Sequence, residues 1–152
     1  MRLRLLFITL LFCCTTLFAA DSPFSGTWKL NLEKGHIIPP APKSMTVHVE
    51  NDGDNFKLHN EIVDDKGTTS IVSFDAKVDG KDYPVTGDPM VDLISIQRIN
   101  DHKIKLTVKK DGKLVGTQTV TVSKDGQTTT TDDDFYMPDG KEQKGAGVYD
   151  KQ

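Results

Sequence analysis

Apolar and polar residues alternate with a period of two along most of this chain, and Asp-Gly pairs interrupt the alternation at short intervals. The pairs begin at Asp52, Asp79, Asp111, Asp125 and Asp139. Asp-Gly favours tight hairpin turns, because both residues tolerate the positive φ that such turns need. Strands with one apolar and one polar face are typical of an antiparallel sheet around a single core. The chain therefore predicts an all-β, antiparallel up-and-down meander.

Most of the expected strands carry one clear apolar face. These faces are Trp28, Leu30 and Leu32; Met45, Val47 and Val49; Phe56, Leu58 and Ile62; Val72, Phe74, Ala76 and Val78; and Ile104, Leu106 and Val108. A further face is expected at Leu114, Gly116, Gln118, Val120 and Val122, where Gly116 predicts a bend or bulge. The segment 128–131 consists of threonines, which favour strands but give no apolar face, so we expect an edge-like, mostly exposed strand there.

The first twenty residues have the pattern of a cleaved secretory signal. Arg2 and Arg4 precede an apolar run at 5–12, and small residues end the segment. This order of charge, apolar stretch and small residues is typical of an export signal, and the run is shorter than the ~20 residues that span a bilayer. We expect a signal at 1–20, one domain at 21–152, and an exported, periplasmic or secreted protein. The alternative is an uncleaved membrane anchor.

Both cysteines, Cys13 and Cys14, lie within the expected signal. The mature domain would then have no disulfide, no thiol nucleophile and no Cys-based zinc site. Removal of Arg2 and Arg4 lowers the Lys+Arg count from 19 to 17 against 22 Asp+Glu, so the formal net charge goes from −3 to −5. A mildly acidic domain has no general attraction for nucleic acid, and we expect no such partner.

Two short segments carry a resemblance to known barrels: Gly26-Thr27-Trp28-Lys29-Leu30 and Val148-Tyr149-Asp150-Lys151. The first resembles the Gly-x-Trp signature of lipocalins and is similar to the start of the fatty-acid-binding proteins. The second is similar to the Arg-x-Tyr-Glu-Lys ending of the latter family. The resemblance implies a lipocalin-like (calycin) barrel of about eight to ten strands. It also implies that the first and last strands close the barrel and that Trp28 plugs its base, with Gly26 letting the chain pass close beneath.

The whole chain also resembles a set of uncharacterised bacterial secreted proteins, which share the Gly-Thr-Trp-Lys-Leu-Asn start and the stretch 79–89. It departs from the fatty-acid-binding proteins in two places. Their lid helices correspond to the Pro-rich interval 33–43, which cannot sustain a helix. Their ligand-binding Arg aligns with Gly147, while Tyr149 matches their Tyr. The resemblance therefore implies the fold and does not imply a fatty-acid ligand.

Large side chains on the expected inward faces are candidates for ligand contact. They either line a small apolar pocket or fill the core, as in many small barrels. These residues are Trp28, Met45, Phe56, Phe74 and Tyr149. If a pocket exists, inward polar groups such as Tyr149, Gln118 or Asn60 would orient the ligand.

Apolar residues on two loops are candidates for the rim of the barrel. They are Ile37 and Ile38 in the Pro-rich interval, and Phe135 and Tyr136 before the turn at Asp139. Exposed apolar residues on loops suit a lid or a partner contact, and packing over an open barrel end is the alternative.

The sequence shows no catalytic constellation, no nucleophile-elbow motif and no phosphate loop. His48 and His59 are expected to be diagonal neighbours on adjacent strands, about 7–8 Å apart, without the third ligand that a zinc site needs. Asp132, Asp133 and Asp134 cannot converge on calcium, because successive strand residues point to opposite faces. We therefore expect no metal, no cofactor and no enzyme activity.

Two functions remain open at this point. The first is an exported lipocalin-like protein that binds a small hydrophobic ligand in the barrel interior, with no stable membrane insertion after signal cleavage. The second is an extracytoplasmic protein-interaction barrel, an inhibitor or envelope factor, with a filled core. Fold alone does not decide between them.

Overall fold

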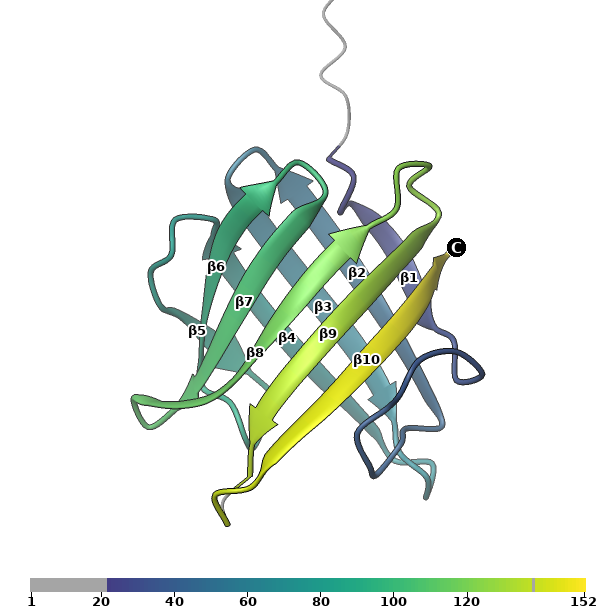
Figure 1. Cartoon of the computed structure of the whole chain (residues 1–152), viewed down its shortest axis with the longest axis vertical. Coiled ribbons are helices and arrows are strands. Elements are labelled where there is room, and N and C mark those ends of the chain that lie inside the picture. The colour runs from purple at the N-terminus through teal and green to yellow at the C-terminus, as the bar shows by residue number, and fades with distance from the viewer. Residues whose placement is uncertain (1–21, 138) are drawn as a thin grey trace, which may run out of the picture.

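The computed structural model describes residues 22–137 and 139–152, and these residues form ten antiparallel strands and no helix (Figure 1). The strands are β1 (Gly26–Leu30), β2 (Ser44–Asp52), β3 (Asn55–Val63), β4 (Thr69–Lys77), β5 (Tyr83–Thr86), β6 (Leu93–Asn100), β7 (Lys103–Lys110), β8 (Lys113–Val122), β9 (Thr128–Tyr136) and β10 (Glu142–Lys151). The predicted signal at 1–20 lies outside the described residues. Within the described ranges, no helix has the length and apolarity needed to cross a membrane.

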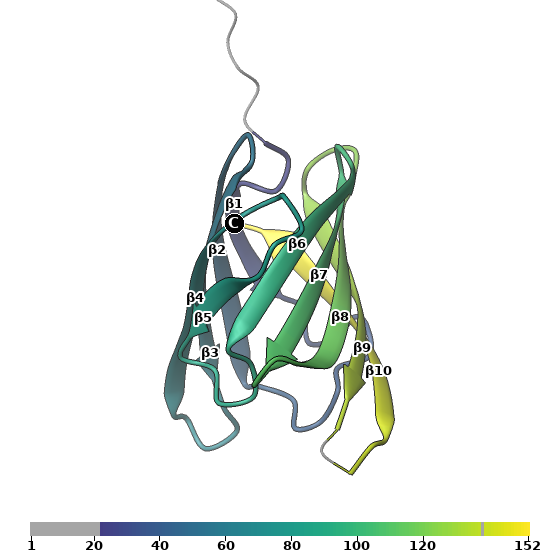
Figure 2. The same ribbon diagram turned by 90° about the vertical axis from the view of Figure 1, so that its left-hand side faces the viewer.

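Each strand pairs with its neighbours in the sequence, and β1 also pairs with β10, so the sheet closes into a barrel. At this seam Trp28 pairs with Lys151 and Leu30 pairs with Tyr149. Figure 2 shows the two curved walls that result, with β1 to β4 on one side and β7 to β10 on the other. The predicted all-β up-and-down meander and its closure into a barrel are confirmed.

The Asp-Gly pairs lie between strands, as predicted, and their glycines have positive φ at Gly53, Gly80, Gly112, Gly126 and Gly140. The aspartate has positive φ in only one of these pairs, at Asp111. Positive φ at both central residues is the mark of a type I′ hairpin turn. The other pairs therefore use glycine alone for the left-handed position.

A packed core of buried side chains fills one end of the barrel. It contains Phe24, Trp28, Val49, Phe56, Ala76, Ile94, Ile96, Ile104, Leu106 and Val122. Trp28 is 3% exposed, and its indole Nε1 donates a hydrogen bond to the Phe24 carbonyl over 2.9 Å. The indole buries a large apolar ring while its polar N–H remains bonded. The inward alternation predicted from the sequence therefore produces this core.

The pairing of β1 with β10 also explains why residue 26 is a glycine. A Cβ at this position would lie 2.8 Å from Cε of Lys151, whose ammonium sits 5.1 Å from the centre of the Trp28 ring. Gly26 thus leaves room for a lysine side chain that makes a cation–π contact with Trp28. The close neighbour of Gly26 is thus a side chain of β10.

The segment β8–β9 departs from the sequence prediction in part. A bulge occurs where predicted, since Val108 pairs with Gly116 but Lys109 pairs with Leu114, which leaves Val115 unpaired in the ladder. The extra residue of the bulge moves the residues before it to the opposite face of the sheet. Leu114 therefore points outward and is 48% exposed. The assignment of Leu114 to the inward face was therefore wrong.

The threonine segment at the start of β9 is interior, and the expectation of an edge-like, exposed strand was wrong. Thr129 is 7% exposed and Thr131 is 5% exposed, and β9 pairs with both β8 and β10. A closed barrel has no edge strand, so β9 has a partner on both sides and its alternate residues face the interior. Thr131 Oγ1 accepts a hydrogen bond from the Gly147 amide at 3.0 Å.

Candidate functional site

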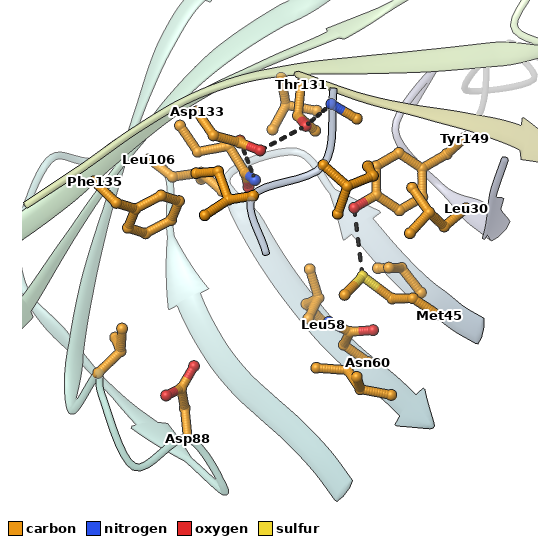
Figure 3. Close-up of a pocket in the computed structure, with 18 of the residues that line it drawn as sticks. Leu30, Met45, Leu58, Asn60, Asp88, Leu106, Thr131, Asp133, Phe135 and Tyr149 are labelled. Carbon is orange, nitrogen blue, oxygen red and sulfur yellow. Dashed lines mark hydrogen bonds between the residues drawn. The ribbon is translucent and has the colours of Figure 1, made fainter. Parts of the chain in front are cut away.

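A cavity of about 670 Å³ lies between the packed core and the opposite end of the barrel (Figure 3). Phe24, Trp28, Phe56 and Ile104 form its floor. Its mouth is lined by Ile37, Ile38, Pro39, Pro40, Pro42, Met90, Tyr136 and Met137. Small-molecule pockets generally measure about 300–1,000 Å³. The barrel interior is thus filled at one end and hollow at the other.

The wall of the cavity is mainly apolar, because inward positions alternate along every strand. The apolar wall includes Leu30, Met45, Val47, Leu58, Ile62, Leu106, Val115, Val120 and Phe135. Such a lining favours an apolar ligand by removing its surface from water, at about 25 cal/mol per Å². A few polar groups in this surface then determine how a ligand is oriented.

A polar group of three side chains on β8 and β9 interrupts the apolar wall. The Asp133 carboxylate accepts a hydrogen bond from Gln118 Nε2 at 2.7 Å through Oδ1 and one from Thr131 Oγ1 at 3.3 Å through Oδ2. Burial raises the pKa of Asp133, and the nearby charge of Asp132 adds to this, while the two hydrogen bonds oppose it. Asp133 is therefore a carboxyl group whose negative charge is only partly compensated by the protein.

Tyr149 faces the cavity from β10. Its hydroxyl donates to Met45 Sδ at 3.4 Å, and a thioether is a weak acceptor. Burial, and then the charge of Asp133, raise the pKa of Tyr149. The phenol is therefore neutral at ordinary pH and keeps its acceptor capacity for a ligand.

Asn60 and Thr129 also line the cavity. Asn60 lies on β3, four strands away from β9 around the barrel. Its Oδ1 and the Thr129 Oγ1 are buried and have no hydrogen-bond partner among the described residues. A buried polar atom without a partner is destabilising, and these two atoms are enclosed by protein rather than exposed on the cavity surface.

The formal charges around the cavity have one sign. Among the described residues that line it there is no lysine, arginine or histidine, whereas Asp133 and Asp88 are both present. Asp88 lies on the connection between β5 and β6, and Asp133 lies on β9. The electrostatic potential inside the cavity is therefore set by carboxylates and by oriented hydroxyl and amide dipoles.

The structure places four of the five interior candidates around the cavity. Trp28 and Phe56 form part of the floor, and Met45 and Tyr149 lie on the wall. Phe74 does not line the cavity; it belongs to the packed end, where its ring stacks on Phe56 with centroids 6.2 Å apart. The inward direction of Phe74 follows from alternation, but its depth along the barrel does not.

All four rim candidates line the cavity, three of them at its mouth and Phe135 on its wall. Ile37 and Ile38 lie in the connection between β1 and β2 and are partly buried. Phe135 and Tyr136 lie on β9, which runs further than the sequence indicated. Phe135 is partly buried against Gly116, whereas Tyr136 is 44% exposed.

The connection between β1 and β2 is held against β10. His36 and Ala146 form a bridge in which each amide donates to the other's carbonyl at 2.7 Å. Ile38 packs over Gly145, where a Cβ would lie 2.7 Å from Ile38 Cγ1. The connection thus covers part of the mouth without any helix.

The histidine pair on the outer face differs from the expectation. His48 and His59 are directly opposite each other in the β2–β3 ladder, with ring centroids 6.4 Å apart, so they are not diagonal neighbours. His48 Nδ1 shares a hydrogen bond with Thr27 Oγ1 at 2.8 Å. In the part of the chain that the structure describes, no group of three or more His, Cys, Asp or Glu is placed to hold a metal ion.

Sequence reasoning named Gln118, Asn60 and Tyr149 as possible inward polar groups, and all three line the cavity. It missed Thr131 and Asp133 as cavity residues. The signal for them was the same alternation: once Thr129 faces inward, Thr131 and Asp133 share its face. The absence of apolar residues in this segment concealed that signal.

The described residues form a closed, up-and-down, ten-stranded antiparallel barrel with an internal, mainly apolar cavity. No family model matches the chain, and no curated protein matches it. Among solved structures, the chain is similar to zebrafish ileal bile acid-binding protein complexed with cholic acid, with a TM-score of 0.58 and 15% identity over 86% of this chain and 100% of that chain. At this identity the likeness shows the barrel fold, and the protein that shares it is a binding protein.

Proposed function

We propose that this protein binds a small hydrophobic molecule in the barrel cavity, outside the cytoplasm. The observation that carries the proposal is the cavity of about 670 Å³, which has a mainly apolar wall and lies inside a closed barrel. The similar solved structure gives support from the same fold, because that protein is complexed with cholic acid.

The alternative of a protein-interaction barrel with a filled core has less support. This alternative was based on apolar residues in two loops. However, Ile37, Ile38 and Phe135 are partly buried and line the cavity. Their apolar surface faces the interior, where it suits a ligand better than a protein partner. The cavity also contradicts the filled core that this alternative assumed at the mouth end.

The extracytoplasmic location in this proposal rests on the sequence pattern of residues 1–20. Expression in a bacterial host would place the mature protein in the periplasm or medium, with its N-terminus within a few residues of Asp21 by mass spectrometry. An intact protein that stays in the cytoplasm would contradict the location and leave the binding proposal to its own test.

Ligand binding is tested with a neutral apolar fluorescent dye, N-phenyl-1-naphthylamine, titrated into the purified protein. We expect saturable uptake with one site. Replacing Ile62, which lines the cavity from β3, by Trp should weaken dye affinity about tenfold or more, because the larger side chain occupies the cavity. The measurement is dye fluorescence at equilibrium.

The matched control is Ile71→Trp. Ile71 lies on the neighbouring strand β4, is 47% exposed and does not line the cavity. It receives the same substitution and should bind the dye as the unmodified protein does. Absence of saturable uptake by the unmodified protein, or equal loss in both variants, would reject an interior binding site.

A further inference from the structure

The feature that sets this cavity apart is the single carboxylate on its wall beyond the mouth. Asp133 has one hydrogen-bond donor on each oxygen, from Gln118 and Thr131. A carboxylate has about four acceptor positions, so capacity remains on both oxygens. These oxygens lie at the cavity wall, as Figure 3 shows.

The surroundings of Asp133 favour a cationic partner. No opposite charge offsets the burial of its carboxylate, since no lysine, arginine or histidine occurs among the described residues that line the cavity. An acidic ligand would meet a like charge without a counter-ion, which is unfavourable in a partly dehydrated site. A ligand ammonium would supply the missing compensation and form a charge-assisted hydrogen bond.

The strand next to Asp133 carries two glycines. The cross-strand partner of Asp133 on β10 is Gly145, and Gly147 lies opposite Thr131. Ile38 and the His36 carbonyl fill the space beside Gly145, and Thr131 Oγ1 and the Tyr149 ring fill the space beside Gly147. Ile38 therefore places an apolar cover near the carboxylate, on the side of the connection between β1 and β2.

Asp133 is the polar group that meets a donor ligand. Asn60 Oδ1 and Thr129 Oγ1 have no hydrogen-bond partner among the described residues, but both atoms are enclosed by protein. The Asp133 oxygens therefore supply the acceptors for an ammonium group, which carries up to three donors.

We propose that the ligand is an amphipathic amine: an apolar body that fills the cavity and one cationic nitrogen that is bound by Asp133. This inference rests on the proposed function, because it requires a molecule in the barrel interior. It assigns Asp133 as the residue that selects ligands by charge, with Gln118 and Thr131 as its positioning residues.

The test is displacement of N-phenyl-1-naphthylamine by three compounds with the same chain: decylamine, decanol and decanoate, at neutral pH where the first is a cation and the last an anion. We expect decylamine to bind about tenfold or more tightly than decanoate, with decanol between them. Asp133→Asn should reduce the ratio of amine to carboxylate affinity by about tenfold or more.

The matched control is Asp132→Asn, on the outer face of the same strand. It removes the same formal charge, so any effect of net charge on the amine is equal in the two variants, and its affinity ratio should stay that of the unmodified protein. Two results would overturn the amine proposal while the binding function stands. In one, the protein takes up the dye but binds decanoate as tightly as decylamine. In the other, the ratio of amine to carboxylate affinity changes equally in both variants. Absence of dye uptake overturns both.

Discussion

Asp133 controls the electrostatics of the cavity through its position on one strand. Alternation directs it inward while Asp132 and Asp134 point to the outer face, which is why three adjacent acids do not form a cation site. Its hydrogen bonds with Gln118 and Thr131 stabilise the charged form, and burial acts against it with the larger effect.

This balance makes the stability of the fold depend on pH. Because the pKa of Asp133 is raised above its usual value near 3.8, the folded protein binds this proton more readily than the unfolded chain. The contribution of this group is present in full below the unfolded pKa and is lost as pH rises through the folded pKa. Deprotonation of Asp133 therefore destabilises the fold.

The side chain at position 133 cannot ionise in the variant Asp133→Asn. We therefore expect the melting temperature of the variant minus that of the unmodified protein to increase as pH rises from about 3 to about 7. Thermal unfolding followed by circular dichroism across this range measures the difference. Asp132→Asn, on the outer face, should show no such increase. A difference that is constant, or that shrinks with rising pH, would contradict the assignment.

The sequence predicted the facing of many apolar residues, but not of Leu32 and Leu114, which are 49% and 48% exposed. Met45, Val47, Leu58 and Ile62 face inward as their alternation indicates. Asp133 was missed because alternation was read from apolar residues alone, and the depth of Phe74 was missed because periodicity gives direction and not height along the barrel.

At the scale of elements, the connection between β1 and β2 takes the place of a helical lid. Its Pro residues prevent helix formation, as the sequence predicted, and the His36–Ala146 bridge holds it to β10. Gly35 makes this approach possible, because it has a φ of +84° and a Cβ there would clash with the Ala146 carbonyl.

Gly35→Ala should release this connection from β10 and increase the dissociation rate of the bound dye several-fold, about the effect of losing one or two hydrogen bonds. Stopped-flow dilution of the dye complex measures the rate. Gly67→Ala is the control: its φ is +86°, but a Cβ there meets no atom within 4 Å. The two variants share the backbone strain, so equal dissociation rates would show that the connection does not cover the cavity.

The bulge and the threonine segment show where element prediction succeeds. Gly116 indicated an irregularity, and the ladder shifts beside it; the Phe135 ring occupies the place that a side chain at position 116 would take. The segment starting at Thr128 gave no apolar signal, and only closure of the barrel placed it inside. Closure is a property of pairs of distant strands, which local patterns do not encode.

The whole molecule divides into a packed end and a hollow end. Residues of β1, β2, β3, β7, β8, β9 and β10 line the cavity, whereas no residue of β4, β5 or β6 does so. Ile96 and Ile104, at 0% and 1% exposed, lie in the packed end. Local opening is easiest where few apolar contacts resist it. The two ends should therefore differ in dynamics even though their backbone ladders are continuous.

Hydrogen exchange followed residue by residue should show this gradient. Amides of β6 and β7 near Ile96 and Ile104 should exchange more slowly than those near the mouth, such as the end of β9 at Phe135. Saturation with dye should slow exchange mainly at the mouth end, because the bound molecule restores packing there. Uniform protection along the strands, with or without dye, would contradict this division.

The seam between β1 and β10 has a practical consequence for anyone who tethers this barrel. Ser22, whose hydroxyl bonds to Asn51 at the β2–β3 turn, and Lys151, beside Gly26, both lie at the packed end. A fusion partner or sensor surface attached through either of them leaves the opening pointing away from the support. Immobilised in this way, the protein can exchange its guest with solution without steric interference from its anchor.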